Sequence, residues 1–440
     1  MALNGGSVDT SGSQTYGERA VLGANTTLTG TTVTLSAGAD ASAAGAQALT
    51  VTGNASFGAA LGAIQALNAL NVTGTSSLDG SVSTTGDQSY SRTVAITVDT
   101  TLRSLAGSLI FGSTIDSPSA KALTLGADAG TIEVAGDVGA TSALSTLALR
   151  GGNTTRFGAS VTAGEITQTE GGSTSFGGAV RATGAGGVQL NARGLQFDSS
   201  VSAQAGDITL ALRDSIGSVS FAPSSTVRAA TGFVQTAGAA MAMPATIEVV
   251  RGPISIQAPA ISGDLTLSTD GLISLAGLNA AQSVVQMNAG SGALKIGTAN
   301  SGAPLSLVVG TLRVSTAGSA SLYGSIGGQG GAIAASRVSS PLVGAPYFMN
   351  DTPWGPTEII ATITATTVPS FAVPSTPGLG ALFSGTVSRA DFAPNSLQAY
   401  RSPAILTIAP LPMNIAPVPR TGPAFVPTPG REREDLEKAR

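Results

Sequence analysis

The segments FGASV (Phe157 to Val161), FGGAV (Phe176 to Val180) and FDSSV (Phe197 to Val201) share one pattern: a phenylalanine, then Gly or Asp, two small residues and an aliphatic residue. The three copies begin 19 and 21 residues apart. That spacing is about the length of one coil of a parallel β-helix, in which three short strands and their turns make each coil. We therefore expect one phenylalanine position per coil to stack into an internal ladder, formed by Phe57, Phe111, Phe157, Phe176 and Phe197.

Short runs of alternating apolar and polar residues surround these segments. Examples are Leu49 to Thr52 (LTVT), Val33 to Leu35 (VTL) and Ile208 to Leu210 (ITL), each bounded by Gly, Asn, Asp or Ser. A period of two turns Leu, Val and Ile inward and Thr outward. The alternation continues to about residue 340, although the repeat weakens after Phe221. An array of about 15 coils would form a rod on the order of 70 Å long.

A longer repeat contains the shorter one. GSVDTSGSQTY from Gly6 matches GSVSTTGDQSY from Gly80 at an offset of 74 residues, and ALNALNVTG from Ala66 matches ALSTLALRG from Ala143 at an offset of 77. We expect small insertions at the corners of the coils to absorb the difference. Residues 58–71 (GAALGAIQALNALN) carry Leu61, Ile64, Leu67 and Leu70 three apart, which could be one helix face. The second copy is richer in Ser and Thr, so we favour strands there, with a short projecting helix as the alternative.

The composition changes near residue 340. Sixteen of the 22 prolines lie between Pro341 and Pro429, and proline removes donors from a hydrogen-bonded ladder. The sequence therefore predicts an all-β chain with a β-solenoid over 1–340, an irregular proline-rich capping or linker region over 341–430 and a charged tail over 431–440. Within the proline-rich region, EIIATITATTV (from Glu358) and AILTIAPL (from Ala404) could cap the solenoid or pair with another chain.

Composition also excludes several kinds of function. The chain has no cysteine and no histidine, which removes disulfides, thiolate metal sites and the commonest general base. Charged residues are 10% of the chain and lysine occurs three times, so no basic surface for nucleic acid is expected. No segment has 18 or more strongly apolar residues, and the first residues, MALNGGSVDTSG, do not resemble a signal peptide. We expect no cofactor and no metal, and a chain that is a piece of a longer exoprotein.

Carboxylate chemistry remains open to such a sequence. Glycoside hydrolysis needs two carboxyl groups about 5 to 9.5 Å apart. The candidates are Asp198 with Asp207 and Glu165 with Glu170. Neither spacing recurs at the length of a coil, and both pairs lie beside Gly or Ser at expected corners, which favours solvated turns.

Threonine pairs raise a second possibility. Thr27 with Thr29, Thr32 with Thr34, and Thr50 with Thr52 could form a flat outward array, as an ice-binding face would. Their spacing in the chain indicates that these pairs are not in register from one coil to the next. Outward threonine is also what strand propensity favours in any case.

Four segments carry a resemblance to a known family: GANTTLTGTTVTL (from Gly23), QALTVTGNASFG (from Gln47), ALNVTGTSSL (from Ala69) and TTGDQSY (from Thr84). In composition and order they resemble the filamentous haemagglutinin-like exoproteins of Gram-negative bacteria. The resemblance covers residues 6–210 well and 210–340 loosely. It implies a right-handed parallel β-helix, export through an outer-membrane transporter by two-partner secretion, and a role in adhesion or biofilm.

We therefore expect a non-enzymatic structural or adhesive protein, extracellular or at the cell surface. Its partners would be carbohydrate or protein on a host or neighbouring cell. Two alternatives stay open. One is a carbohydrate-active β-helix enzyme that uses carboxylates, and the other is a subunit of an extracellular filament or matrix fibre that self-associates end to end.

Overall fold

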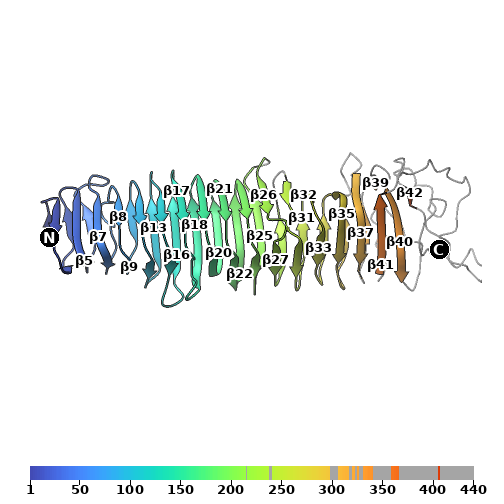
Figure 1. The fold of residues 1–440 in the computed structure, drawn as a ribbon, viewed down its shortest axis with the longest axis horizontal. Helices are drawn as coiled ribbons and strands as arrows, with labels where there is room; N and C mark the ends of the chain where they lie inside the picture. The colour runs from blue at the N-terminus through green and yellow to red at the C-terminus, as the bar shows by residue number, and fades with distance from the viewer. Residues whose placement is uncertain are drawn as a thin grey trace, which may run out of the picture.

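Parallel strands, separated by tight corners, stack into one long β-solenoid in the computed structural model (Figure 1). The structure describes residues 1–214, 216–236 and 240–297, and beyond them residues 306–316, 320–322, 325–326, 331–339, 358–365 and 405–406. The solenoid has about 14 turns, and the residues just given form no helix. The expectation of an all-β parallel β-helix is confirmed.

Each coil contributes a strand, or at Leu61 and Val138 a single bridging residue, to each of three faces. We call these faces A, B and C in the order that the chain visits them from Ser7. Face A contains β2 (Ser7–Asp9), the first parts of β5 (Thr26–Leu35) and β7 (Leu49–Phe57), β8 (Leu70–Val72), β11 (Gln88–Tyr90), β14 (Leu109–Phe111), β17 (Thr131–Val134), β19 (Thr154–Phe157), β21 (Ser173–Phe176), β23 (Gly194–Phe197), β26 (Ser218–Phe221), β29 (Ala240–Ala242), β32 (Pro259–Ala260) and β39 (Ser325–Ile326).

Face B contains the second parts of β5 and β7, β3 (Gln14–Tyr16), β9 (Ser76–Leu78), β12 (Val94–Ile96), β15 (Ile115–Asp116), the first parts of β20 (Val161–Glu170) and β22 (Val180–Ala192), β24 (Val201–Ala203), β27 (Thr226–Ala229), β30 (Thr246–Val249), β33 (Leu265–Ser268), and most of β35 (Asn279–Asn288) and β37 (Ser306–Ser315).

Face C contains β1 (Ala2–Leu3), β4 (Ala20–Leu22), β6 (Ala39–Ala41), β10 (Val82–Thr84), β13 (Thr100–Ser104), β16 (Ala122–Ala127), most of β18 (Leu144–Gly151), the later parts of β20 and β22, β25 (Asp207–Leu212), β28 (Gly232–Gln235), β31 (Ile254–Ile256), β34 (Ile273–Leu275), β36 (Leu294–Ile296) and β38 (Ala320–Leu322).

Alternation along each strand builds a continuous core. In β25, for example, Ile208, Leu210 and Leu212 point inward and are buried, while the residues between them are half-buried on the outer side. The register between strands then places apolar side chains over apolar side chains from one coil to the next. One inward column of face C consists of Leu123, Leu147, Ile166, Val188, Ile208, Phe233, Ile254, Ile273 and Leu294. No single coil could bury these side chains, so the core exists only through stacking.

Aromatic rings form a ladder inside face A. Phe157, Phe176 and Phe197 stack with ring centroids 5.2 and 5.4 Å apart and planes 4° from parallel. Phe221 extends the stack at 4.8 Å. These spacings are close to the roughly 4.8 Å between neighbouring strands, because each ring lies directly over its equivalent in the next coil.

Phe111 lies in the same column but outside this stack. It pairs with Val134, which in turn pairs with Phe157, so an aliphatic residue separates the two aromatic runs. On its other side Phe111 stacks on Tyr90 at 5.1 Å. The column therefore mixes aromatic and aliphatic residues.

Phe57 does not belong to this ladder, and the expectation of one shared position is wrong for it. Phe57 pairs with Leu35 and Leu78 on face B, and the residue that ends its motif, Leu61, bridges to Val82 on face C. The repeated pattern marks a corner rather than a face. Phenylalanine closes one strand, the small residues turn, and the aliphatic residue opens the next strand. Such a corner fits between faces A and B or between B and C.

The 74-residue repeat also changes face. Val8 of the first copy pairs with Leu28 on face A, whereas the matching Val82 pairs with Leu102 on face C. Gln14 likewise lies on face B, and its match Gln88 on face A. From β2 to β10 the chain makes three full coils and passes two further faces, so the repeat is not a whole number of coils.

Residues 58–71 form no helix, so that alternative is wrong. Leu61, Leu67 and Leu70 are buried, but Ile64 is 73% exposed. Leu61 and Leu67 make single parallel bridges to Val82 and Thr84, and Leu70 begins β8. The apparent three-residue period comes from a loop that leaves face C between two inward-pointing leucines.

The two apolar runs of the proline-rich region supply strands next to β40 (Gly331–Ser339). β41 (Glu358–Ala365) pairs with β40 in antiparallel orientation, and β42 (Ile405–Leu406) pairs with it in parallel orientation. The remainder of the proline-rich region and the charged tail lie outside the described residues.

The aromatic ladder makes a stability prediction. We expect Phe176→Ala to lower the free energy of unfolding by about 3–5 kcal/mol, because it opens a cavity between two rings. The loosening should be local, since each coil contacts only its neighbours. Denaturant unfolding, with hydrogen exchange of the strands that carry Phe157 and Phe197, measures both effects. Ser175→Ala, on the outer side of the same strand, is the control. A Phe176→Ala protein as stable as this control would refute the ladder's role.

Candidate functional site

The carboxylate pairs do not converge. Glu165 and Glu170 lie at opposite ends of the face C part of β20, five residues apart, which in an extended strand is about 16 Å. Asp198 lies at the corner before β24 and Asp207 begins β25, so β24 separates them. Asp198 accepts a hydrogen bond from Gln196 Nε2 at 2.8 Å, and Asp207 accepts hydrogen bonds from Gln189 and Thr209. Nothing in this arrangement places two carboxyl groups around one glycosidic bond.

Small polar side chains form ordered columns on the outer side of the first coils. One column on face A consists of Ser7, Thr27, Thr50, Asn71 and Ser89. One on face B consists of Thr15, Thr34, Ser56 and Ser77. Thr27 and Thr29 are in register with Thr50 and Thr52, so the expectation that these two pairs are out of register is wrong. Thr32 and Thr34 lie beside Asn54 and Ser56 instead. Threonine gives way to Asn71 and Ser89 on face A and to Ser56 and Ser77 on face B, and the columns then end at Ile110 and Ala95.

Two polar clusters, one partly and one fully buried, have the same design in the two copies of the repeat. Gln88 is buried, and its Nε2 donates to the carbonyl oxygens of Val82 (3.3 Å) and Arg103 (2.8 Å). Tyr90 donates from its hydroxyl to Gln88 Oε1 at 3.1 Å, and burial raises the pKa of Tyr90. Gln14 and Tyr16 make the matching bonds in the first copy. These groups satisfy one another inside the solenoid, so they hold the corner and offer nothing to a ligand.

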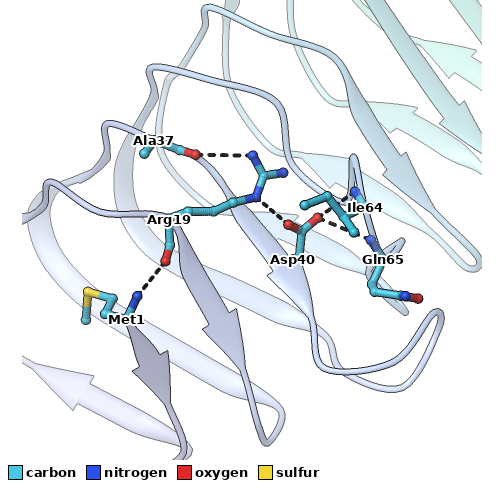
Figure 2. Close-up of polar contacts among 6 residues, drawn as sticks. All are labelled: Met1, Arg19, Ala37, Asp40, Ile64 and Gln65. Carbon is cyan, nitrogen blue, oxygen red and sulfur yellow. Dashed lines mark hydrogen bonds and ion pairs between the residues drawn. The ribbon is translucent and has the colours of Figure 1, made fainter.

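An ion pair fastens the loop that follows β7 (Figure 2). Arg19 Nε donates to Asp40 Oδ2, and Asp40 Oδ1 accepts the backbone N–H groups of Ile64 (3.0 Å) and Gln65 (3.3 Å). Burial alone raises the pKa of Asp40, but the hydrogen bonds from Arg19, Ile64 and Gln65 outweigh it and hold that pKa below its usual range. Arg19 also donates to the carbonyl of Ala37, and its own carbonyl accepts the amino group of Met1.

Asp116 repeats this anchor in the second copy without an arginine. It accepts the backbone N–H groups of Thr141 (2.9 Å) and Ser142 (3.3 Å). Burial opposes ionisation of Asp116, but the bonds from Thr141, Ser117 and Ser142 keep its pKa lowered. Each loop starts at a glycine with positive φ, Gly62 (66°) and Gly139 (68°). These loops are structural elements of the rod surface.

A polar groove lies on the corner between faces C and A, in the middle of the described rod. Its volume is about 410 Å³, and its charged lining residues are Asp128, Glu170, Arg193 and Arg213. The floor is formed by Gly151, Gly152, Gly171 and Gly172, with Asn153 and Ser173 beside them. The groove extends across several stacked coils, because these segments occupy the same corner one coil after another.

Close backbone contact between coils explains why glycines, without side chains, form the floor of the groove. A Cβ atom on Gly172 would lie 1.9 Å from the carbonyl oxygen of Asn153 in the preceding coil, so only glycine fits there. Gly151 and Gly152 have φ values of 69° and 86°, a conformation that glycine adopts without strain. The signal was present in the sequence as RGGN (from Arg150) and EGGS (from Glu170), 20 residues apart. Only the pairing of β19 with β21 shows that the two segments occupy the same corner in successive coils.

Comparison with known protein families, with curated proteins and with solved structures gives no match for this chain. Among the described residues, no helix is long and apolar enough to span a membrane. The same part of the chain holds no group of three or more acidic side chains arranged for a metal ion.

The two anchors predict matched effects. Asp40→Asn should release the loop at Ile64 and Gln65 and cost about 3 kcal/mol, because it breaks a largely buried ion pair. Asp116→Asn should release only the loop at Thr141 and Ser142. Hydrogen exchange followed by mass spectrometry reports both loops in each variant, so each protein is the control for the other. Equal exchange of both loops in either variant would contradict separate anchoring.

The anchors also predict a dependence on pH. An aspartate whose folded pKa is below its unfolded value of about 3.9 stabilises the fold above that value, and the contribution disappears as pH falls through the folded pKa. We expect protection of Ile64 and Gln65, corrected for intrinsic exchange rates, to be constant from pH 7 to about 5 and to fall in strongly acidic solution. The dependence should be absent in Asp40→Asn. Protection that persists unchanged at pH 2 would argue against the anchor.

Proposed function

We propose that this chain is a non-catalytic structural and adhesive segment of a bacterial cell-surface or secreted exoprotein, which binds through its extended repeat faces. The observation that carries the proposal is the set of outward columns on faces A and B. In these columns Ser, Thr and Asn recur in register from coil to coil.

Such columns favour binding by many weak contacts. Each offers hydrogen-bonding groups about every 4.8 Å over the first four or five coils, and their short side chains lose little conformational freedom on contact. One hydroxyl contributes little, but several that bind together raise the overall affinity. Carbohydrate or protein on the surface of a host or neighbouring cell provides the repeated polar groups that would match.

The stacking mode of the solenoid also suits export through an outer-membrane transporter. Each coil packs only on its neighbours, so a chain emerging from a pore can add one coil at a time. The resemblance of residues 6–210 to filamentous haemagglutinin-like exoproteins supports the same proposal. An enzymatic role has less support, since Glu165 and Glu170 lie about 16 Å apart along one strand.

Removal of single coils tests the proposal. Gln88 occupies the position of Leu70 one coil later, so deletion of residues 70–87 joins two equivalent positions and keeps the register. It shortens the rod by about 4.8 Å and removes Asn71 and Ser77 from the outer columns. We expect partial loss of adhesion, measured as retention of epithelial cells and of biofilm-forming bacteria on protein-coated surfaces under flow.

The control deletion removes residues 247–266, a coil without those columns, and joins Thr246 to Leu267, the equivalent of Ile247. It shortens the rod equally and should reduce adhesion less. Thr50→Ala alone should have little effect. Complete loss of adhesion from Thr50→Ala, or equal loss from both deletions, would rule out binding spread along the polar columns.

A further inference from the structure

We propose that the groove between faces C and A binds a short saccharide that carries a single carboxylate, such as a uronic-acid disaccharide. This proposal goes beyond adhesion through the extended faces, because it assigns a discrete site on a corner, away from the outer columns of the first coils.

The size and floor of the groove suit a small polar ligand. A volume of about 410 Å³ lies within the range of roughly 300–1,000 Å³ that is usual for small-molecule sites. Four glycines keep side chains off the floor, so a ligand can approach the backbone closely. The groove residues include no aromatic side chain, and recognition would therefore depend on hydrogen bonds and charge rather than on ring stacking.

The charges of the groove indicate which ligand it suits. Asp128 is already paired with Arg103 at 2.7 Å, and Arg193 lies 3.7 Å from Asp214. Arg213 and Glu170 form no ion pair within the described residues. The guanidinium of Arg213 and the carboxylate of Glu170 therefore line the same groove without an ion-pair partner among the described residues.

Their chemistry is complementary to an acidic sugar. A guanidinium can donate two parallel hydrogen bonds to one carboxylate, which fits Arg213 to the acid group. Glu170 can only accept hydrogen bonds when ionised, which suits sugar hydroxyls. Asn153 donates its Nδ2 to the carbonyl of Ala129 at 2.6 Å, and its amide oxygen can accept a further hydrogen bond.

A highly charged polyanion fits less well. The two arginines and two acidic residues that line the groove sum to no net charge. Each further sulfate or carboxylate on a polymer would face Glu170 or Asp128 and be repelled. The arrangement therefore favours one acid group among neutral hydroxyls over a continuous string of negative charges.

A matched pair of ligands tests the proposal. Cellobiouronic acid and cellobiose differ at one carbon, which is a carboxylate in the acid and a hydroxymethyl group in cellobiose. Titration calorimetry on the full chain measures the affinity of both. We expect the acid to bind at least about tenfold more tightly, as one charge-assisted contact can provide. Arg213→Ser should abolish the preference. Glu170→Ala should weaken both ligands, because both keep their hydroxyls.

Arg181→Ser is the control, since Arg181 is exposed on face B and belongs to no ion pair in the described structure. It should leave both affinities unchanged. Equal binding of the two disaccharides, or a preference that survives Arg213→Ser, would overturn the proposal. So would a heparin tetrasaccharide that binds more tightly than the acid and is weakened equally by Arg213→Ser and Arg181→Ser. Adhesion that survives Arg213→Ser would leave the proposed function intact, because the two experiments probe different surfaces.

Discussion

Parallel hydrogen bonding between coils is the constraint on which the rest of this structure depends. Because each strand pairs in register with its equivalent one coil later, every side chain lies about 4.8 Å from the side chain at the same position. Identical rings then stack, as Phe157, Phe176 and Phe197 do. Like charges would be neighbours and would repel, so opposite charges alternate instead: Glu133 lies beside Arg156, and Arg228 beside Glu248. The same closeness admits only glycine where corners touch, as at Gly172.

Sequence patterns predicted the strands well, since alternation is a local property. Val33 to Leu35 and Ile208 to Leu210 lie in strands with the expected inward side chains. Which face a strand joins is not local, because coil lengths vary. Ser76 pairs with Val94, 18 residues later, whereas Val201 pairs with Val227, 26 residues later. For this reason the motif of Phe57 could not be distinguished from that of Phe111, and Thr27 and Thr50 were wrongly expected to be out of register.

The candidate site also combines features that the sequence predicts locally with a placement that only the fold shows. RGGN and EGGS are plain in the sequence, but only the fold shows that they meet on one corner beside Arg193 and Arg213. Conversely, Glu165 and Glu170 are close in the chain but lie at opposite ends of a strand. In a solenoid, residues one coil apart are neighbours, while residues five apart are not. Proximity in the sequence is therefore a poor guide to a site on this fold.

The internal repeat places its two copies on different faces, and this affects how the rod meets its surroundings. Side chains that point outward from one copy have counterparts directed to another side of the axis. A rod extended by such units would carry related surface patterns in a spiral around its length. Every side of such a rod would then carry part of the pattern. A partner could bind the rod at any rotation of the rod about its long axis.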